Sequence, residues 1–268
     1  MAKYRLLAAD MDGTLLDSSS NISGITLQAI NDAMAAGVRF AVVSGRSVPS
    51  LMRFPFIREL NCPVIAYNGA AIYDPKEDKL LYYEGLENSD ALWLLKRANE
   101  RGITVCAWSR NRYYTNLINE RSLDYGRLSG MEPTVFTDCE ALAAHGVTKI
   151  IWNDSPEKVQ QYIKDLDKEK FASLSYCTSN PCFLELMNKK VSKARALEML
   201  CGFYGITLDE TAAAGDGEND LSMLKAVGLG VAMANAGDSV KSQCGYITAS
   251  NDEDGVARLI YDVILKEE

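Results

Sequence analysis

The chain has 268 residues, of which 47% are hydrophobic and 24% charged, so it is long enough for one large or two modest domains with a buried core. Its net charge of −8, without a basic patch, argues against nucleic acid and anionic membranes as partners. The sequence has no apolar run of membrane length and no signal-peptide pattern, and its seven cysteines are scattered. These features predict a cytoplasmic protein with free thiols.

Strand and helix signals alternate over the first part of the chain. The apolar run 5–9 predicts a strand that is buried on both faces. A helix is expected between Ser23, a capping residue, and Gly37, a stop residue, and two further strands are expected at 38–43 and 64–67. This β-α-β-α-β order favours a parallel sheet with right-handed crossovers.

The pattern changes in the middle of the chain. An acidic turn at 74–78 predicts a hairpin, and from about Glu84 the signals are those of a mixed α+β region. Its expected elements are a helical stripe at 91–98, a helix that starts at 154–157, and strands at 103–108, 149–152, 171–177 and 183–187.

The alternating pattern returns at Lys190. We expect helices at 194–204, 221–226 and 256–264, and strands at 211–215 and 229–233. The chain is therefore predicted to be an α/β protein with a doubly wound, Rossmann-like parallel-sheet core formed by residues 1–82 and 190–268. Residues 83–189 are predicted to form a second, α+β domain that is inserted into this core.

Two carboxylates follow the first predicted strand directly. The segment 10–15 reads DMDGTL, so that Asp10 and Asp12 lie two residues apart and Gly13 permits a sharp turn. Two carboxylates held together repel each other and need a proton, solvent or a cation, and Mg²⁺ suits a site made of oxygen ligands. A solvated Asp-Gly turn is the plain structural alternative.

Two further segments fall at a predicted strand end and a predicted helix start. Ser44-Gly45-Arg46 follows the second strand, where a hydroxyl and backbone N–H groups form a natural cradle for phosphate. Lys193 lies near the start of a helix, a place where an anion would stabilise it. Taken alone, Ser44 is better explained by helix capping and Lys193 by exposure to solvent.

The last segment, 215–220, reads GDGEND and follows a strand of small residues. Asp216 could bind a metal there, and Asn219 could hydrogen-bond a phosphate. Parallel strands present their carboxyl ends at one edge of the sheet, so the four segments are expected to meet. Together they contain a nucleophile, a proton carrier, a metal site and a positive charge, which phosphoryl transfer requires because its catalysis is mainly positioning and charge stabilisation.

These four segments resemble the four motifs of the haloacid dehalogenase-like superfamily. The long insert before Lys193, and the segment YNGA at 67–70 after the third strand, resemble the Cof-type sugar-phosphatase branch and its α+β cap. The resemblance spans almost the whole chain. Ala194, where these relatives often have glycine, is a small departure that leaves the lysine in place.

The resemblance implies a role for each motif residue. Asp10 would be the nucleophile that forms an aspartyl-phosphate, and Asp12 the general acid and base. Mg²⁺ is implied on the Asp10 carboxylate, the Asp12 backbone carbonyl and Asp216. The implied phosphate-binding groups are the Met11 backbone N–H, Ser44, Gly45, Lys193 and Asn219, with Asp220 orienting the loop and Lys193.

The expected function is that of a magnesium-dependent phosphatase for small phosphorylated metabolites, with sugar phosphates as the expected substrates. The inserted domain would act as a cap that closes over the site and selects the leaving group. A phosphotransferase or phosphomutase uses the same nucleophile and stays open as an alternative. A phospho-accepting switch is the non-enzymatic alternative, although the chain is far longer than one flavodoxin-like unit. The pattern assigns no oligomeric state.

Overall fold

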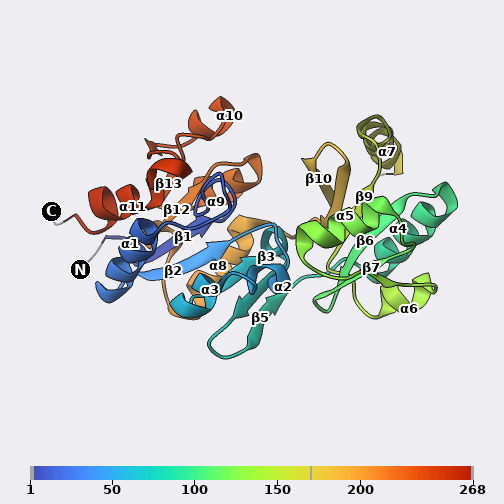
Figure 1. Ribbon diagram of the computed structural model, residues 1–268, viewed down its shortest axis with the longest axis horizontal. Helices are drawn as coiled ribbons and strands as arrows, with labels where there is room; N and C mark the ends of the chain where they lie inside the picture. Colours follow the sequence, from blue (N-terminus) through green and yellow to red (C-terminus); the bar gives the residue numbers. More distant parts are fainter. Residues whose placement is uncertain (1–2, 170, 267–268) are drawn as a thin grey trace. The chain divides into compact units, whose positions relative to one another are not determined.

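The protein is described by a computed structural model that covers residues 3–169 and 171–266. The chain separates into two compact units, of which one joins Met1–Tyr83 to Ser192–Glu268 and the other is Glu84–Val191 (Figure 1). We call them the core unit and the inserted unit. Residues 1 and 268, the outer limits of the predicted core, lie outside the described residues. Within the described residues, no helix has the length and apolar character needed to cross a membrane.

The core unit contains the following helices and strands in chain order: β1 (Leu6–Asp10), α1 (Gly24–Ala35), β2 (Arg39–Val43), α2 (Val48–Leu51), α3 (Pro55–Leu60), β3 (Val64–Ala66), β4 (Ala71–Asp74), β5 (Lys79–Tyr83), α8 (Lys193–Tyr204), β12 (Thr211–Gly215), α9 (Leu221–Ala226), β13 (Leu229–Ala232), α10 (Asp238–Lys241), β14 (Tyr246–Ile247) and α11 (Gly255–Leu259).

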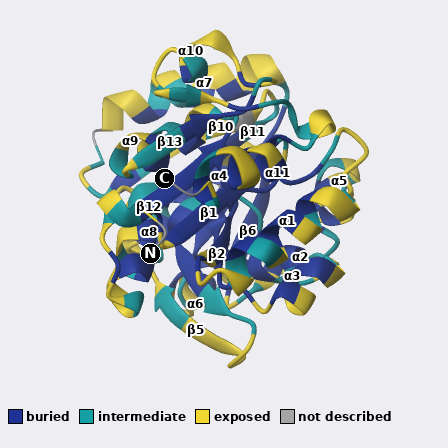
Figure 2. Ribbon diagram, turned by 90° about the vertical axis from the view of Figure 1, so that its left-hand side faces the viewer, coloured by how far each residue is buried: buried dark blue, intermediate teal, exposed yellow. Residues whose placement is uncertain are grey.

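The described part of the core unit forms an eight-stranded sheet in the order β14-β13-β12-β1-β2-β3-β4-β5. Neighbouring strands from β14 to β3 run parallel, and β3, β4 and β5 form antiparallel pairs, as the predicted hairpin requires. Leu6 and Ala8 of β1 pack in one cluster with α8 and α9, while Leu7 and Ala9 are buried on the opposite face. The predicted doubly wound α/β core is therefore confirmed. Figure 2 shows its central strands buried and the edge strand β5 with a mixture of exposed and intermediate residues.

Local signals explain where several elements begin and end. The hydroxyl of Ser23 accepts a hydrogen bond from the backbone N–H of Thr26 and so caps α1 as predicted. The third strand is one residue shorter than expected, because Tyr67 has a φ of 54° and leaves the extended conformation. The predicted closing helix at 256–264 is in part different, since α11 gives way to a π-helical turn at Ile260–Ile264.

The inserted unit contains the following helices and strands in chain order: α4 (Asn88–Arg101), β6 (Thr104–Ser109), β7 (Arg112–Thr115), α5 (Glu120–Ser129), β8 (Thr134–Val135), α6 (Cys139–Ala144), β9 (Lys149–Asn153), α7 (Pro156–Glu169), β10 (Leu174–Asn180) and β11 (Phe183–Asn188).

The described part of the inserted unit forms a six-stranded sheet in the order β10-β11-β9-β6-β7-β8. Its strands pair antiparallel except for the parallel pair β7 and β8. The predicted helical stripe is the buried face of α4, which packs with α7 and the sheet in one apolar cluster. The strand expected from residue 171 begins at Leu174, and α5 and α6 were not expected from the sequence.

Candidate active site

The parallel strands of the core unit bring the four sequence motifs to the same edge of the sheet. Asp10 is the last residue of β1 and lies opposite Val43, so that Ser44 follows at the same level. On the other side of β1, Gly215 ends β12 and is followed by Asp216. The carboxyl ends of neighbouring parallel strands form the usual ligand crevice of such a sheet.

Lys193 links two of the motifs through a buried ion pair. It is the first residue of α8, whose cap Ser192 accepts a hydrogen bond from the backbone N–H of Arg195. The Nζ atom of Lys193 lies 2.5 Å from Oδ1 of Asp10 and 2.5 Å from Oδ1 of Asp220. Its side chain is fully buried, so the two carboxylates replace the water that a lysine normally binds.

Asp216 is fixed by contacts with the first motif and with Asp220. The second oxygen of Asp220, Oδ2, accepts hydrogen bonds from the backbone N–H groups of Asp216 (3.1 Å) and Gly217 (2.9 Å). The hydroxyl of Thr14 donates to Oδ1 of Asp216 at 3.2 Å. Gly13 has a φ of 78°, and a Cβ atom there would lie 2.4 Å from Oδ2 of Asp216, so only glycine fits at this position.

The carboxylates of Asp10, Asp216 and Asp220 form a compact acidic cluster. One oxygen from each lies within 4.8 Å of the others. Burial raises the pKa of Asp10 to about 7, although Lys193 opposes the shift, and the charge of Asp220 raises it further. Burial and the charge of Asp220 raise the pKa of Asp216 to about 6. Because Lys193 supplies one positive charge to three acidic groups, the cluster has the oxygen ligands and the excess negative charge that suit a divalent cation.

Asp12 lies outside this cluster. Its carboxylate accepts two hydrogen bonds from the guanidinium group of Arg46, from Nε at 2.7 Å and from Nη2 at 2.6 Å. Both side chains are partly exposed to solvent. The Asp12 carboxylate is therefore not part of the buried cluster. The metal contact implied for this residue is made by its backbone carbonyl, and it stays a prediction.

The implied phosphate-binding residues lie around this cluster. Met11 is fully buried, and its carbonyl accepts hydrogen bonds from the N–H groups of Leu15 and Leu16, which closes the loop after β1. The hydroxyl of Ser44 is buried and accepts a hydrogen bond from the backbone N–H of Arg46 at 3.1 Å. Asn219 is exposed, and its amide Nδ2 donates to Oδ1 of Asn68 at 3.1 Å.

Three contacts of the site were not expected from the sequence. Arg46 belongs to a predicted motif, but nothing in the motif indicated that its side chain pairs with Asp12. Asn68 was singled out only within the resemblance, without a role. Asn235 donates from Nδ2 to the carbonyl of Gly13 at 2.8 Å, and no sequence signal marked it.

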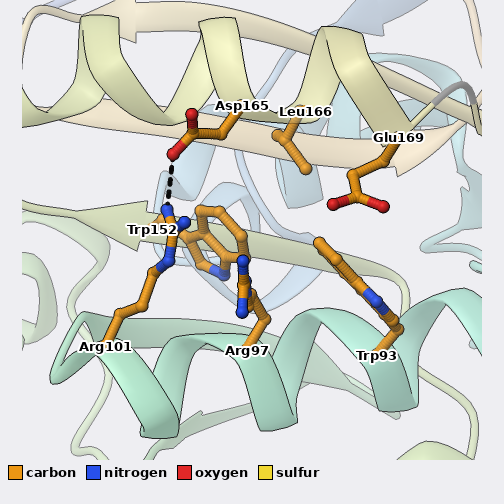
Figure 3. Close-up of a pocket in the computed structure, with 7 residues that line it drawn as sticks. All are labelled: Trp93, Arg97, Arg101, Trp152, Asp165, Leu166 and Glu169. Atoms are coloured by element: carbon orange, nitrogen blue, oxygen red, sulfur yellow. Dashed lines mark hydrogen bonds and ion pairs between the residues drawn. The ribbon is translucent and has the colours of Figure 1, made fainter.

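The inserted unit contains a separate small pocket between α4, β9 and α7. Its lining residues are Trp93, Arg97, Arg101, Trp152, Asp165, Leu166 and Glu169 (Figure 3). Arg101 spans the pocket to Asp165 at 2.8 Å, and the buried indole N–H of Trp152 has no hydrogen-bond partner among the residues that the structure describes. The space admits roughly one water molecule, which would satisfy this N–H but is far too small for a metabolite.

Comparisons with known proteins show which family the chain resembles. The sequence model of a family described as haloacid dehalogenase-like hydrolases matches residues 7–260. A 5-amino-6-(5-phospho-D-ribitylamino)uracil phosphatase of Bacillus subtilis is 32% identical, over 97% of this chain and 96% of its own. A second Bacillus subtilis protein, the phosphatase YwpJ, is 30% identical, over 96% of this chain and 98% of its own.

A solved structure shares the fold over its full length. A haloacid dehalogenase-like hydrolase from Bacteroides thetaiotaomicron superimposes with a TM-score of 0.87 at 29% identity, covering 97% of this chain and 99% of that one. Fold and relatives together define the protein as a phosphoric monoester hydrolase. The chain belongs to the haloacid dehalogenase-like hydrolases, and within them to the Cof-type branch, as the motifs predicted.

Proposed function

We propose that the protein is a Mg²⁺-dependent phosphatase that hydrolyses small phosphorylated metabolites through an aspartyl-phosphate on Asp10. The observation that carries the proposal is the convergence of Asp10, Lys193, Asp216 and Asp220 at one edge of the sheet, with Asp12 beside them. A buried carboxylate, a cation and an adjacent exposed carboxylate are the groups that phosphoryl transfer to and from an aspartate needs.

The two aspartates of the first motif have different surroundings, which suits different roles. Asp10 is buried and held by Lys193, so its free oxygen can attack phosphorus and release the leaving group as an alkoxide. Asp12 is exposed, and in its protonated form, released from Arg46, it can donate a proton to that leaving oxygen. The ionised Asp12 can then take a proton from the water that hydrolyses the aspartyl-phosphate, which returns both residues to their starting state.

The chemistry of the acidic cluster fits Mg²⁺. The Asp10 carboxylate, the Asp12 backbone carbonyl and Asp216 would hold the ion, and Asp220 would remain with Lys193. When bound, the cation would reduce the repulsion between the anionic nucleophile and the anionic phosphate. Met11, Ser44, Gly45, Lys193 and Asn219 are proposed to hold the phosphate oxygens.

Sugar phosphates and related small phosphate esters are the proposed substrates. The Bacillus subtilis relative that is 32% identical is named for a substrate with a phosphorylated ribityl chain, which is of this chemical kind. The inserted unit, predicted at 83–189, is proposed to select the leaving group. Phosphate release from a panel of phosphorylated metabolites, measured beside sugar-phosphate isomerisation, separates hydrolysis from phosphomutase chemistry.

The Asp10→Asn variant tests the nucleophile. We expect kcat to fall by at least about a thousandfold, because the amide cannot form the acyl-phosphate, while the circular dichroism spectrum stays native. Asp262→Asn is a matched control, since Asp262 is an exposed aspartate of the same unit. Near-normal turnover by Asp10→Asn would rule out the nucleophile and the covalent mechanism with it.

A further inference from the structure

The turn after β3 has an unusual backbone. Tyr67, Asn68 and Gly69 follow one another with φ values of 54°, 57° and 106°. Glycine adopts this left-handed region at no cost and asparagine tolerates it, but tyrosine does so only when its surroundings enforce it. Such strain persists where many contacts fix the chain, and it is frequent at functional sites.

The backbone of this turn contacts two of the predicted motifs. The N–H of Tyr67 donates to the carbonyl of Arg46 at 2.9 Å, and that of Asn68 donates to the carbonyl of Ser44 at 3.0 Å. A Cβ atom on Gly69 would lie 2.2 Å from the carbonyl oxygen of Ser192, the cap of the helix that begins with Lys193. The turn therefore holds the Ser44 loop by its backbone and touches the start of α8.

The side chain of Asn68 joins two motif loops that are far apart in sequence. Its Oδ1 atom accepts a hydrogen bond from Nδ2 of Asn219 at 3.1 Å. The same amide lies against Gly45, because a Cβ atom placed on Gly45 would be 3.0 Å from Oδ1 and 3.3 Å from Nδ2 of Asn68. Glycine at position 68 would suit the backbone, but it would leave the amide of Asn219 without this acceptor.

We propose that Asn68 is a positioning residue of the phosphate site, which orients the side-chain amide of Asn219 toward the bound phosphate. The inference rests on the proposed function, since it assumes that Asn219 binds phosphate. A primary amide has two N–H donors, and Asn68 takes one of them, which fixes the amide plane. The second N–H is then held in one direction and is available to a phosphate oxygen without loss of side-chain freedom on binding.

A double-mutant cycle with Asn68→Gly and Asn219→Ala tests the inference. Hydrolysis of p-nitrophenyl phosphate and competitive inhibition by inorganic phosphate are measured for the wild type, both single variants and the double variant. We expect Asn68→Gly to lower kcat/KM roughly tenfold, mainly through KM, and to weaken phosphate inhibition by a similar factor. In the Asn219→Ala background the same change should have almost no effect, because its partner is absent.

Asn61→Gly is the matched control. Asn61 is also an asparagine of positive φ (52°), but it ends α3 at an exposed position, so this variant reproduces the effect of glycine on the unfolded chain. The melting temperature of Asn68→Gly should equal that of Asn61→Gly within a few degrees.

Each remaining outcome counts against a defined part of the proposal. Equal losses of kcat/KM from Asn68→Gly in both backgrounds would show that Asn68 acts independently of Asn219, and they would overturn the inference. The proposed function would still stand in that case if the wild type is active and the Asn219→Ala variant is weakened. An Asn219→Ala variant with unchanged kcat/KM would overturn the inference together with the phosphate role of Asn219. A wild type without phosphatase activity would contradict the proposed function itself.

Discussion

The ammonium group of Lys193 compensates two carboxylates that are buried next to each other. Asp10 and Asp220 are both within 2.5 Å of Nζ, and all three side chains are buried. Burial alone would lower the pKa of Lys193, but the charges of Asp10 and Asp220 raise it, so the lysine stays protonated. Removing this charge leaves two buried carboxylates without their shared cationic partner.

The Lys193→Met variant should therefore lose stability as well as activity. We expect the free energy of unfolding, measured by urea titration at neutral pH without added metal, to fall by about 3–5 kcal/mol. The deficit should shrink toward pH 5, because protonation removes the charge of the unpaired carboxylates. Lys225→Met, at an exposed position of the same unit, should change stability by less than about 0.5 kcal/mol. Equal losses in the two variants would show that the buried ion pair is not what stabilises the core.

At the level of single elements, the start of α7 shows how one side chain can fix a helix. Asp154 precedes the helix and accepts hydrogen bonds from the N–H of Ser155 (2.8 Å), the hydroxyl of Tyr162 (2.8 Å) and Nζ of Lys158 (3.2 Å). Arg121 of α5 lies 3.3 Å away, so the carboxylate also joins two helices. A negative charge at a helix N-terminus is favoured further by the helix dipole.

Asp154→Asn should weaken the inserted unit in a pH-dependent way. Burial acts to raise the pKa of Asp154, but the hydrogen bonds from Tyr162, Ser155 and Lys158 outweigh it and leave the pKa below its ordinary value of 3.8. A carboxyl group with a depressed pKa in the folded state stabilises the protein above its unfolded pKa, and this contribution is lost as the pH falls through the folded value.

Thermal unfolding at pH 7 and near pH 3 checks this prediction. We expect the free energy of unfolding to fall by about 1 kcal/mol at pH 7. The loss is small because Lys158 is exposed and Arg121 partly exposed, so that solvent screens their charges. The difference from the wild type should narrow near pH 3. Asp124→Asn, which breaks an exposed ion pair with Arg127, is the control and should have little effect at either pH. A loss that grows as the pH falls would contradict the assigned role of the ionised carboxylate.

For the whole molecule, the acidic cluster predicts that protons and Mg²⁺ compete. Asp10 and Asp216 have pKa values of about 7 and about 6 in the metal-free protein, and both must lose their protons to bind the cation. Between pH 6 and 8 the Mg²⁺ concentration for half-maximal activity should therefore decrease as the pH rises, by up to roughly tenfold per pH unit for each displaced proton.

Activity and melting temperature, both titrated with Mg²⁺, measure this competition. EDTA should abolish activity and Mg²⁺ should restore it. Saturating Mg²⁺ should also raise the melting temperature, because an ion held by the proposed site would bind the folded protein and not the unfolded chain. Asp216→Asn should lose most of this stabilisation. Full activity in the presence of chelator would reject the metal role, and a midpoint that does not change with pH would show that these two carboxylates are not its ligands.

Much of the fold followed from local patterns. The strand of small residues at 211–215, the helix cap Ser23 and the helical stripe of α4 all match the structure, because each is decided by residues within a few positions of one another. The helix α5 was missed although Asn119 forms a capping box with Ser122 and Gly130 ends the helix. The capping and stop signals were present in the sequence, but the many polar residues of the segment obscured its helical pattern.

The amino-acid pattern alone was enough to nominate residues for the proposed chemistry: two aspartates after a buried strand, a small hydroxyl, a lysine at a helix start and a second acidic loop. The partners of these residues, such as Arg46 for Asp12 and Asn68 for Asn219, became known from the fold. The cause lies in the order of the strands. Because β12, β1, β2 and β3 lie side by side and parallel, loops up to about 200 residues apart meet at one edge, and no local pattern encodes which side chains then touch.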